Sequence, residues 1–338
     1  MNGRAGIKGL RSRASGAVRR LRRLLPRRPE PAILMYHRIG AETFDPWGLA
    51  VAPERFAAQL EWLARNRTIL PLAEFAAMHR EGRLPANAVA LTFDDAYACN
   101  AQVAVPMLER FGIPATIFVP AELIERGHEF WWDDLERMVL GHHGSVLCVN
   151  DGDGAEQVAV GEPEAGDRHW APDAGPTTPR QRSFHLLWSR LREKAPAELF
   201  AAMEQLRRQT RTPAKPRPSH RPMTADEVRS AGAATIDIGA HSLTHPSLPT
   251  LRPADKRHEI VDSVARCEAI SGTIPRTMAY PYGDFDAESE QLAEDAGFAC
   301  ACTTEHAFVT PHARAFALPR MQAGDWGPER LARMLGGA

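Results

Sequence analysis

Short, uniformly apolar segments alternate along this chain with longer segments of helical periodicity, and this alternation limits the fold more than any other feature. Apolar segments without polar alternation are typical of strands that are covered on both faces. Strands that alternate with helices form parallel βαβ units with right-handed crossovers. The sequence therefore predicts an α/β fold, and it favours a βα barrel over an antiparallel sandwich. The predicted strands lie at residues 32–37, 88–93, 115–120, 235–240, 277–283 and 298–304.

The alternation lapses between about residues 125 and 222. Helical patterns occur there in "FWWDDLERMVL", "RSFHLLWSRLREK" and "AELFAAMEQLRRQT", whereas the Gly- and Asp-rich residues between the first two predict a long loop. We expect residues 31–323 to form the barrel, with 125–222 as an insertion in one βα loop rather than an independent domain. One long helix is predicted over 255–270 and a last helix within 324–338.

The charge of the chain is unevenly distributed. Its 338 residues include 41 Lys and Arg against 42 Asp and Glu, yet residues 1–28 contain ten basic side chains and no acidic one. We expect residues 1–30 to be a disordered basic leader; peripheral contact of 1–28 with a membrane and an organelle transit peptide are the open alternatives. No apolar run follows the arginines, so neither a secretory signal nor a membrane span is expected. The acidic remainder argues against nucleic-acid binding.

Five cysteines are scattered through the chain, and no pair has the spacing of a zinc knuckle or a CxxC motif. An odd number of dispersed thiols favours a reducing compartment. We therefore expect a cytoplasmic protein, associated with a membrane if the leader binds lipid.

Three polar clusters follow three of the predicted strands. Asp94 and Asp95 end the first of these strands, His241 and His245 follow the second, and the Pro-Tyr-Gly of residues 281–283 follows the third. Taken singly, each cluster is a common turn or surface pattern. In a parallel barrel, however, the loops after all strands gather on one face, where active sites are assembled. We therefore expect the three clusters to surround one depression.

The residue types of these clusters are those of a metal-dependent hydrolase. One carboxylate and two imidazoles form a three-ligand site for a divalent cation, most naturally Zn²⁺, with open positions for water and substrate. His241, His245 and one of the two adjacent aspartates are therefore the candidate ligands. The cation would polarise a carbonyl oxygen and acidify a water molecule, and the other aspartate could then accept the proton of that water. This division of labour explains why two carboxylates stand side by side.

The segments "TFDDA", "HSLTH" and "YPYG" resemble the first three motifs of the NodB-like polysaccharide deacetylases, carbohydrate esterase family 4. The resemblance covers roughly residues 31–125 and 222–323. It implies a distorted (β/α)7 barrel and metal-dependent removal of acetyl groups from sugars, usually N-acetyl and sometimes O-acetyl. It also implies that Asp94 is the general base, that Asp95 and the two histidines hold the metal, and that the turn at Tyr282 offers a backbone N–H as an oxyanion hole.

The chain departs from the family pattern at two places. Ala279 stands where the family usually has an Arg that orients the base, and "ALPRM" stands where a Leu-x-His would supply the general acid. A subset of the family that includes enzymes of biofilm-polysaccharide deacetylation carries a Tyr-His near its start. We therefore expect His37 to donate a proton to the leaving amine, the alternative being a structural hydrogen bond to a backbone carbonyl. Arg320 is the expected partner of the Asp94 carboxylate.

The expected substrate is an acetylated glycan or glycolipid precursor. Pro281, Tyr282, Trp131 and Trp132 are predicted to contact it, although tryptophans more often fill cores. An O-acetyl esterase, a non-sugar amidohydrolase and a non-catalytic glycan-binding barrel are the alternatives, the last because of the two departures.

Overall fold

The structure, a computed structural model, describes residues 29–150, 155–171, 174–233 and 235–336. Its centre is an eight-stranded sheet with the order β11-β10-β9-β6-β5-β1-β12, in which β4 lies beside β5. All pairs in this sheet are parallel. The strands are β1 (Ala32–Tyr36), β4 (Thr68–Ile69), β5 (Ala88–Phe93), β6 (Ala115–Val119), β9 (Ile236–Ala240), β10 (Thr277–Ala279), β11 (Cys300–Cys302) and β12 (Met321–Gln322).

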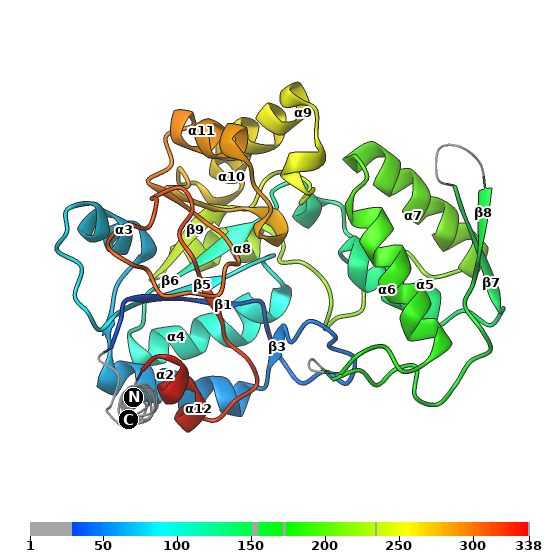
Figure 1. The fold of residues 1–338 in the computed structure, drawn as a ribbon, viewed down its shortest axis with the longest axis horizontal. Coiled ribbons are helices and arrows are strands. Elements are labelled where there is room, and N and C mark those ends of the chain that lie inside the picture. Colours follow the sequence, from blue (N-terminus) through cyan, green and yellow to red (C-terminus); the bar gives the residue numbers. More distant parts are fainter. Residues whose placement is uncertain (1–28, 151–154, 172–173, 234, 337–338) are drawn as a thin grey trace, which may run out of the picture.

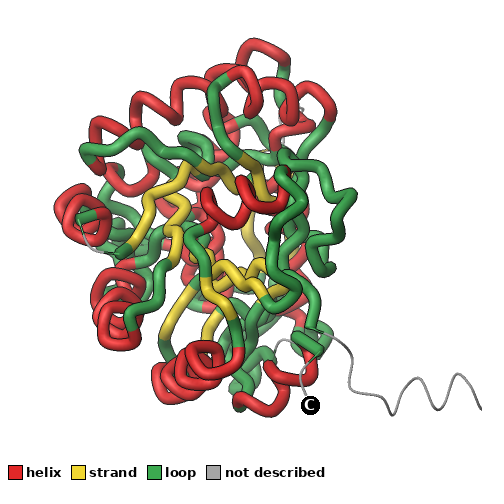
Figure 2. The backbone as a smooth tube through the Cα atoms, turned by 90° about the vertical axis from the view of Figure 1, so that its left-hand side faces the viewer, coloured by secondary structure: helices red, strands yellow, loops and turns green. Residues whose placement is uncertain are grey.

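The sheet curves into a distorted, incompletely closed barrel with helices outside it (Figure 2). Leu34 of β1 pairs with Leu91 of β5 on one side and with Met321 of β12 on the other, so the first and last strands of the chain are neighbours. The ends of the sheet approach each other at a bridge between Cys302 and Leu318. The predicted α/β barrel with parallel strands is therefore confirmed.

The helices between the strands bury one apolar face each. In α2 (Pro53–Asn66), Phe56, Leu60 and Leu63 recur at helical spacing and are fully buried. A capping box opens α8, because Thr224 accepts a hydrogen bond from the N–H of Glu227 and the Glu227 side chain accepts one from the N–H of Thr224. The remaining helices here are α3 (Leu72–Arg80), η1 (Asn100–Ala104), α4 (Val105–Phe111), η2 (Leu123–Glu125), α8 (Ala225–Gly232), η3 (Leu248–Thr250), α11 (Ala287–Asp295) and α12 (Pro328–Met334).

The single helix predicted over 255–270 is interrupted. The structure has α9 (Pro253–Arg257), a π-helical turn η4 (His258–Asp262) and α10 (Ser263–Ser271). Glu259 lies in the π-helical turn and is buried, and its Oε2 accepts the N–H groups of Leu243 and Thr244, each at 2.9 Å. The wider turn thus points a carboxylate at the loop that follows β9, a contact that helical periodicity does not reveal.

Between β6 and α8 the chain forms a second lobe, on the right in Figure 1. It contains α5 (Trp131–Leu140), β7 (Val146–Asn150), β8 (Ala155–Ala159), α6 (Pro179–Arg192) and α7 (Pro196–Thr210), and it has an apolar core of its own. We call the elements of residues 125–222 the insertion. The prediction of a continuous loop between its first two helices is wrong, because β7 and β8 form an antiparallel hairpin. Leu147, Val149 and Val158 face inward, but each arm is too short for its alternation to stand out among the Gly and Asp residues.

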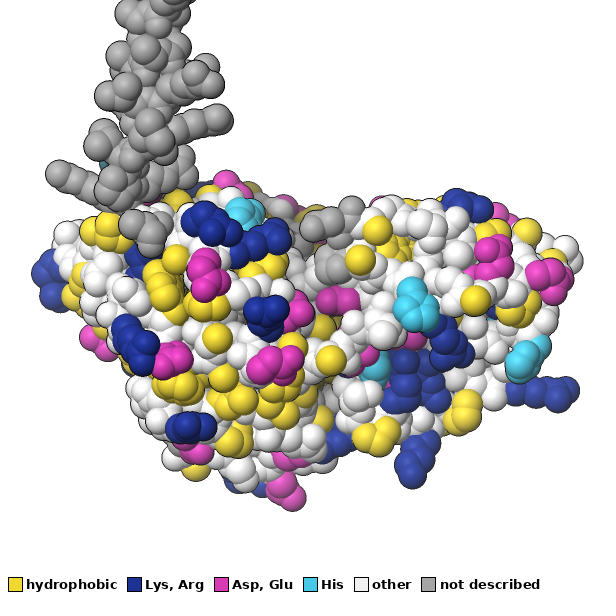
Figure 3. Space-filling view, turned by 90° about the horizontal axis from the view of Figure 1, so that it is seen from below, with side chains coloured by type: hydrophobic (Ala, Val, Ile, Leu, Met, Phe, Trp, Pro, Cys, Tyr) yellow, Lys and Arg dark blue, Asp and Glu magenta, His cyan; other side chains and the backbone are white. Residues whose placement is uncertain are grey.

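Residues 1–28 of the predicted leader lie outside the described residues. Within the described ranges, no helix combines the length and the apolar character that crossing a membrane requires. Basic and acidic side chains are interspersed among the described residues on the face drawn in Figure 3.

Candidate active site

The two adjacent carboxylates are placed by a turn at the end of β5. Asp94 still hydrogen-bonds as a strand residue, since its N–H donates to Tyr36 O at 2.9 Å. Asp95 and Ala96 then adopt positive φ angles of 69° and 53°. This left-handed turn is unusual for side chains with a Cβ and persists only where the surroundings hold it. It lets both carboxylates reach the same buried region instead of opposite faces of the sheet.

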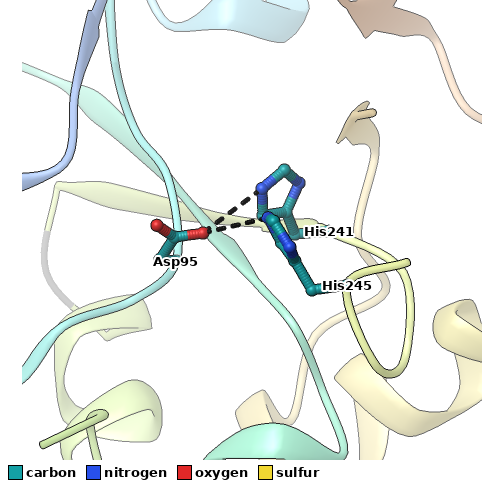
Figure 4. A group of neighbouring side chains, drawn as sticks. All are labelled: Asp95, His241 and His245. Atoms are coloured by element: carbon teal, nitrogen blue, oxygen red, sulfur yellow. Dashed lines mark ion pairs between the residues drawn. The ribbon is translucent and has the colours of Figure 1, made fainter. Parts of the chain in front are cut away.

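Asp95 meets the two histidines of the loop after β9 (Figure 4). Its Oδ1 lies 3.5 Å from His241 Nε2 and 3.3 Å from His245 Nε2. All three side chains are at least 95% buried. His241 Nδ1 donates to Ala279 O at 2.7 Å, so its Nε2 is the atom that faces the carboxylate. The carbonyl in this bond belongs to the position where the family usually has an Arg.

The trio fits a divalent cation. Its donor atoms lie within 4.8 Å of one another, and Asp95 Oδ1 is buried without a hydrogen-bond partner among the described residues. The Nδ1–H of His241 is engaged with a carbonyl, so a neutral ring turns a lone pair toward the carboxylate oxygen. A cation held between these atoms would replace that repulsion by attraction. The mixed N and O donor set suits Zn²⁺.

The electrostatics favour an ionised Asp95. Burial by itself raises the pKa of Asp95, but the facing His241 and His245 lower it by more than burial raises it. The pKa therefore lies well below its usual range. The pKa of His245 is lowered by burial, which favours the neutral ring that ligates metals. The pKa of His241 is raised despite burial, because it faces Asp95 and Asp94 together.

Arg320 binds Asp94 with both ends of its guanidinium group. Nη1 donates to Oδ1 at 2.6 Å and Nη2 to Oδ2 at 2.7 Å, and the arginine is fully buried. Its Nε donates to Thr303 O at 2.9 Å, which fixes the plane of the group. Burial raises the pKa of Asp94, but Arg320 outweighs it, and the pKa lies below its usual range. Arg320 stands immediately before β12, so its guanidinium reaches the Asp94 carboxylate from there and not from β10.

His37 follows β1 and lies on the other side of Asp94. Its Nε2 is 4.0 Å from Asp94 Oδ2, and its side chain is 12% exposed. Its Nδ1 is buried without a hydrogen-bond partner among the described residues. The alternative structural bond from this atom to a backbone carbonyl is therefore not formed.

These residues open onto a cavity of about 420 Å³. His37, Asp94, Asp95, His241, His245, Tyr282 and Trp132 line it, whereas Pro281 and Trp131 do not. Trp131 is 5% exposed, packs in the core of the insertion, and donates its Nε1–H to Tyr282 Oη at 3.1 Å. Arg320 lies behind Asp94, outside the lining.

The sequence analysis missed much of the cavity wall. Phe44 and Trp47 come from the loop between β2 (Arg38–Ile39) and β3 (Ala50–Val51), and Trp188 and Arg192 come from α6. Trp47 and Trp188 form an edge-to-face pair with ring centroids 5.0 Å apart. "FDPWG" has no periodicity, and α6 is placed by the packing of the insertion, so neither could be assigned to the site from local patterns. Asp133, Glu136 and Arg38 form a polar part of the same wall.

Comparison with known proteins agrees with this architecture. A family model described as polysaccharide deacetylase matches residues 81–144 and 173–301, more than half of the chain. YxkH of Bacillus subtilis (strain 168), named as a polysaccharide deacetylase, is 32% identical over 114 residues, which are 33% of this chain and 39% of that protein. A poly-beta-1,6-N-acetyl-D-glucosamine N-deacetylase of Staphylococcus aureus is 32% identical over 71 residues, 21% of this chain and 24% of that protein. The matched segments thus span well under half the length of these relatives.

Solved structures show the same fold over nearly the whole chain. The Streptococcus pyogenes deacetylase PplD, in complex with acetate, has a TM-score of 0.58 at 18% identity and covers 91% of this chain and 99% of its own. IcaB from Ammonifex degensii has a TM-score of 0.56 at 15% identity and covers 91% and 98%. With the family model matched across both strand ends that carry Asp95 and the two histidines, this chain belongs to the polysaccharide deacetylase family.

Proposed function

We propose that this protein is a metal-dependent hydrolase that removes N-acetyl groups from a sugar of a polysaccharide. The observation that carries the proposal is the convergence of Asp95, His241 and His245 on one buried point beside Asp94, at the bottom of an aromatic cavity. The S. aureus relative, an N-deacetylase of a polymeric amino sugar, favours an amide over an ester as the bond cleaved.

Each residue has a part in this reaction. Asp95, His241 and His245 would hold the cation, which when bound supplies Lewis-acid polarisation of the acetyl carbonyl. Asp94 accepts the proton of the attacking water, and Arg320 keeps this carboxylate ionised and oriented. The backbone N–H of Tyr282 donates to the developing oxyanion. His37 donates a proton to the nitrogen as the C–N bond breaks, so that acetate and a free amine leave.

The walls of the cavity suit a sugar within a longer chain. Indole and phenol rings of Trp132, Trp188 and Tyr282 offer flat apolar faces next to polar groups, the combination that sugar rings require. A second hollow of about 1000 Å³ adjoins the cavity and shares Trp47 and Gln322 with it. The second hollow provides room for a neighbouring sugar of the chain on one side of the sugar that is deacetylated.

Acetate release from the purified full chain tests the proposal. With Zn²⁺ supplied, we expect release from oligomers of N-acetylglucosamine, little release from acetylated xylan, and loss of activity with a chelator. Asp94→Asn should abolish turnover with zinc binding retained. His37→Ala should lower kcat by about 10²-fold or more, also without loss of zinc.

Three results would count against the proposal. Release from acetylated xylan alone would make the protein an O-acetyl esterase. No release from any acetylated glycan by the zinc-loaded protein would favour a glycan-binding barrel. Near wild-type kcat in His37→Ala would remove His37 from the mechanism.

A further inference from the structure

Arg192, the last residue of α6, reaches from the insertion to the active-site turn of the barrel. Its Nη2 forms an ion pair with Asp284 Oδ2. The guanidinium carbon lies 4.8 Å from the centre of the Tyr282 ring and 5.4 Å from that of Trp188. The side chain thus contacts the turn that offers the expected oxyanion donor and at the same time lines the cavity.

The carboxylate that Arg192 binds also holds the histidine loop. Ser247 Oγ donates to the same Asp284 Oδ2 at 2.7 Å, and Ser247 is buried, two residues after His245. One oxygen atom therefore joins three segments: the insertion through Arg192, the turn after β10 through Asp284 itself, and the loop after β9 through Ser247.

Tyr282 connects the same segments through its ring. The ring packs against that of His245 with centroids 4.5 Å apart, Arg192 lies over it, and the Nε1–H of Trp131 donates to its Oη. Tyr282 has a φ of 59°. A left-handed conformation at a tyrosine costs energy and is kept only where neighbouring groups over-determine it. Two of those neighbours, Arg192 and Trp131, belong to the insertion.

We propose that Arg192 is a positioning residue through which the insertion sets the geometry of the Tyr282 turn and of the metal ligand His245. The inference rests on the proposed function and gives the insertion a part in it. The ion pair is 30% exposed at Arg192 and 25% at Asp284, and such a pair contributes little to global stability. Its effect lies in placement, because displacing a reacting group by about 1 Å can lower a rate 10²-fold.

The test compares Arg192→Ala, Ser247→Ala and the double variant in the full chain. Zn²⁺ affinity is measured by competition with a chromophoric chelator, and kcat and KM on an N-acetylglucosamine oligomer. We expect each single variant to weaken zinc binding about 10-fold and to lower kcat about 10-fold or more, with little change in KM. The double variant should be no more impaired than the more impaired of the two single variants, because both changes break the same junction at Asp284.

Arg190→Ala is the matched control. Arg190 lies two residues earlier on α6 and pairs with Glu156 inside the insertion at 2.5 Å, so this variant loses an ion pair without touching the active-site loops. Arg192→Lys keeps a charge for Asp284 but loses the planar contact with Tyr282, and it should fall between wild type and Arg192→Ala.

The proposal is overturned if Arg192→Ala matches Arg190→Ala in zinc affinity and kcat. A rise in KM alone would make Arg192 a substrate contact, and additive losses in the double variant would separate it from the Asp284 junction. If the wild-type chain releases no acetate from any substrate, the proposed function fails, while the zinc affinities still decide whether Arg192 positions His245.

Discussion

At the scale of single residues, Arg320 shows how a buried charge can be held for chemistry. The guanidinium is fully buried, and both of its terminal nitrogens donate hydrogen bonds to Asp94. Breaking such a pair leaves an uncompensated charge in the interior, which is more costly than the pair itself is stabilising. The pair therefore makes fold stability and the ionisation of the general base depend on one side chain.

Replacing Arg320 should affect stability and activity together. We expect Arg320→Ala to lower the free energy of unfolding by about 3–5 kcal/mol and to abolish turnover, as measured by urea unfolding and acetate release. Arg320→Lys retains a cation without the two parallel bonds, so it should lose less stability but still most of kcat. Arg314→Ala, which breaks an exposed pair with Glu290, serves as the control and should be near neutral. Unchanged kcat in Arg320→Ala would contradict the orienting role.

The stability of the folded protein should also depend on pH through Asp133. Burial raises the pKa of Asp133 to about 8, although Arg38, Arg217 and a hydrogen bond from Tyr97 Oη oppose the rise. In the unfolded chain an Asp has a pKa of about 3.9. Between these values the folded state binds more protons than the unfolded state, so the contribution of Asp133 to stability falls as pH rises from about 4 to 8.

Asp133→Asn should remove this pH dependence, because the amide still accepts the Tyr97 bond and never ionises. The variant should gain stability relative to wild type between pH 5 and pH 8.5, by up to about 1.4 kcal/mol per pH unit, measured by urea unfolding. Asp226→Asn, at an exposed ion pair, should show no such trend. A variant that loses stability at pH 8.5 would show that Arg38 and Arg217 keep Asp133 ionised.

At the scale of elements, the insertion is organised around one buried arginine near the start of α6. The guanidinium of Arg180 donates to four backbone carbonyls, at 2.7–2.9 Å, and the residue is fully buried. These acceptors lie at the end of α5 and on both sides of the β7–β8 hairpin: Val139, His142, Gly144 and Gly161. A single side chain thus fixes how the helices meet the hairpin, and through α6 it places Trp188 and Arg192 in the cavity.

Arg180→Ala should loosen the insertion and leave the barrel intact. Four carbonyls would lose a charged donor, and each such bond contributes about 1.5–3 kcal/mol. We expect amide hydrogen exchange in β7, β8 and α6 to accelerate at least 100-fold, with little change in β5 and β9. Arg182→Ala on the same helix, whose bond to Thr177 O is exposed, is the control. Equal acceleration in the barrel strands would show that the two lobes unfold as one unit.

At the scale of the whole molecule, what the sequence could predict follows the range of the interactions involved. β5 has the predicted bounds because its apolar run is local, and the clusters at Asp94, Asp95, His241 and His245 meet because a parallel barrel brings strand ends together. Arg320 is expected beside Asp94 because "LPRM" stands where the family usually has another motif, and its guanidinium donates two hydrogen bonds to that carboxylate. Trp47, Trp188 and Arg192 could not be assigned, because the packing of the insertion on the barrel places them and leaves no periodic trace.

The same long-range geometry leads to a prediction on metal removal. The three ligands come from the ends of β5 and β9, with β6 between them in the sheet and the whole insertion between them in sequence. A cation bound here therefore connects the two halves of the barrel, and it binds the folded chain but not an unfolded one whose ligands are far apart. At a free Zn²⁺ concentration 100 times Kd, binding should stabilise the protein by about 2.7 kcal/mol.

Thermal unfolding with and without Zn²⁺ checks this expectation. The midpoint of wild type should rise by several degrees with zinc and return to its starting value with excess chelator. His241→Ala should remove the response, because the trio then lacks one of its two imidazoles. His258→Ala, which removes a ring that is 59% exposed and pairs with Asp262, should keep the full response. A zinc response that survives in His241→Ala would mean that the cation binds elsewhere. In the wild-type protein the charge of the buried Asp95 would then have to be balanced by a protonated histidine that faces it.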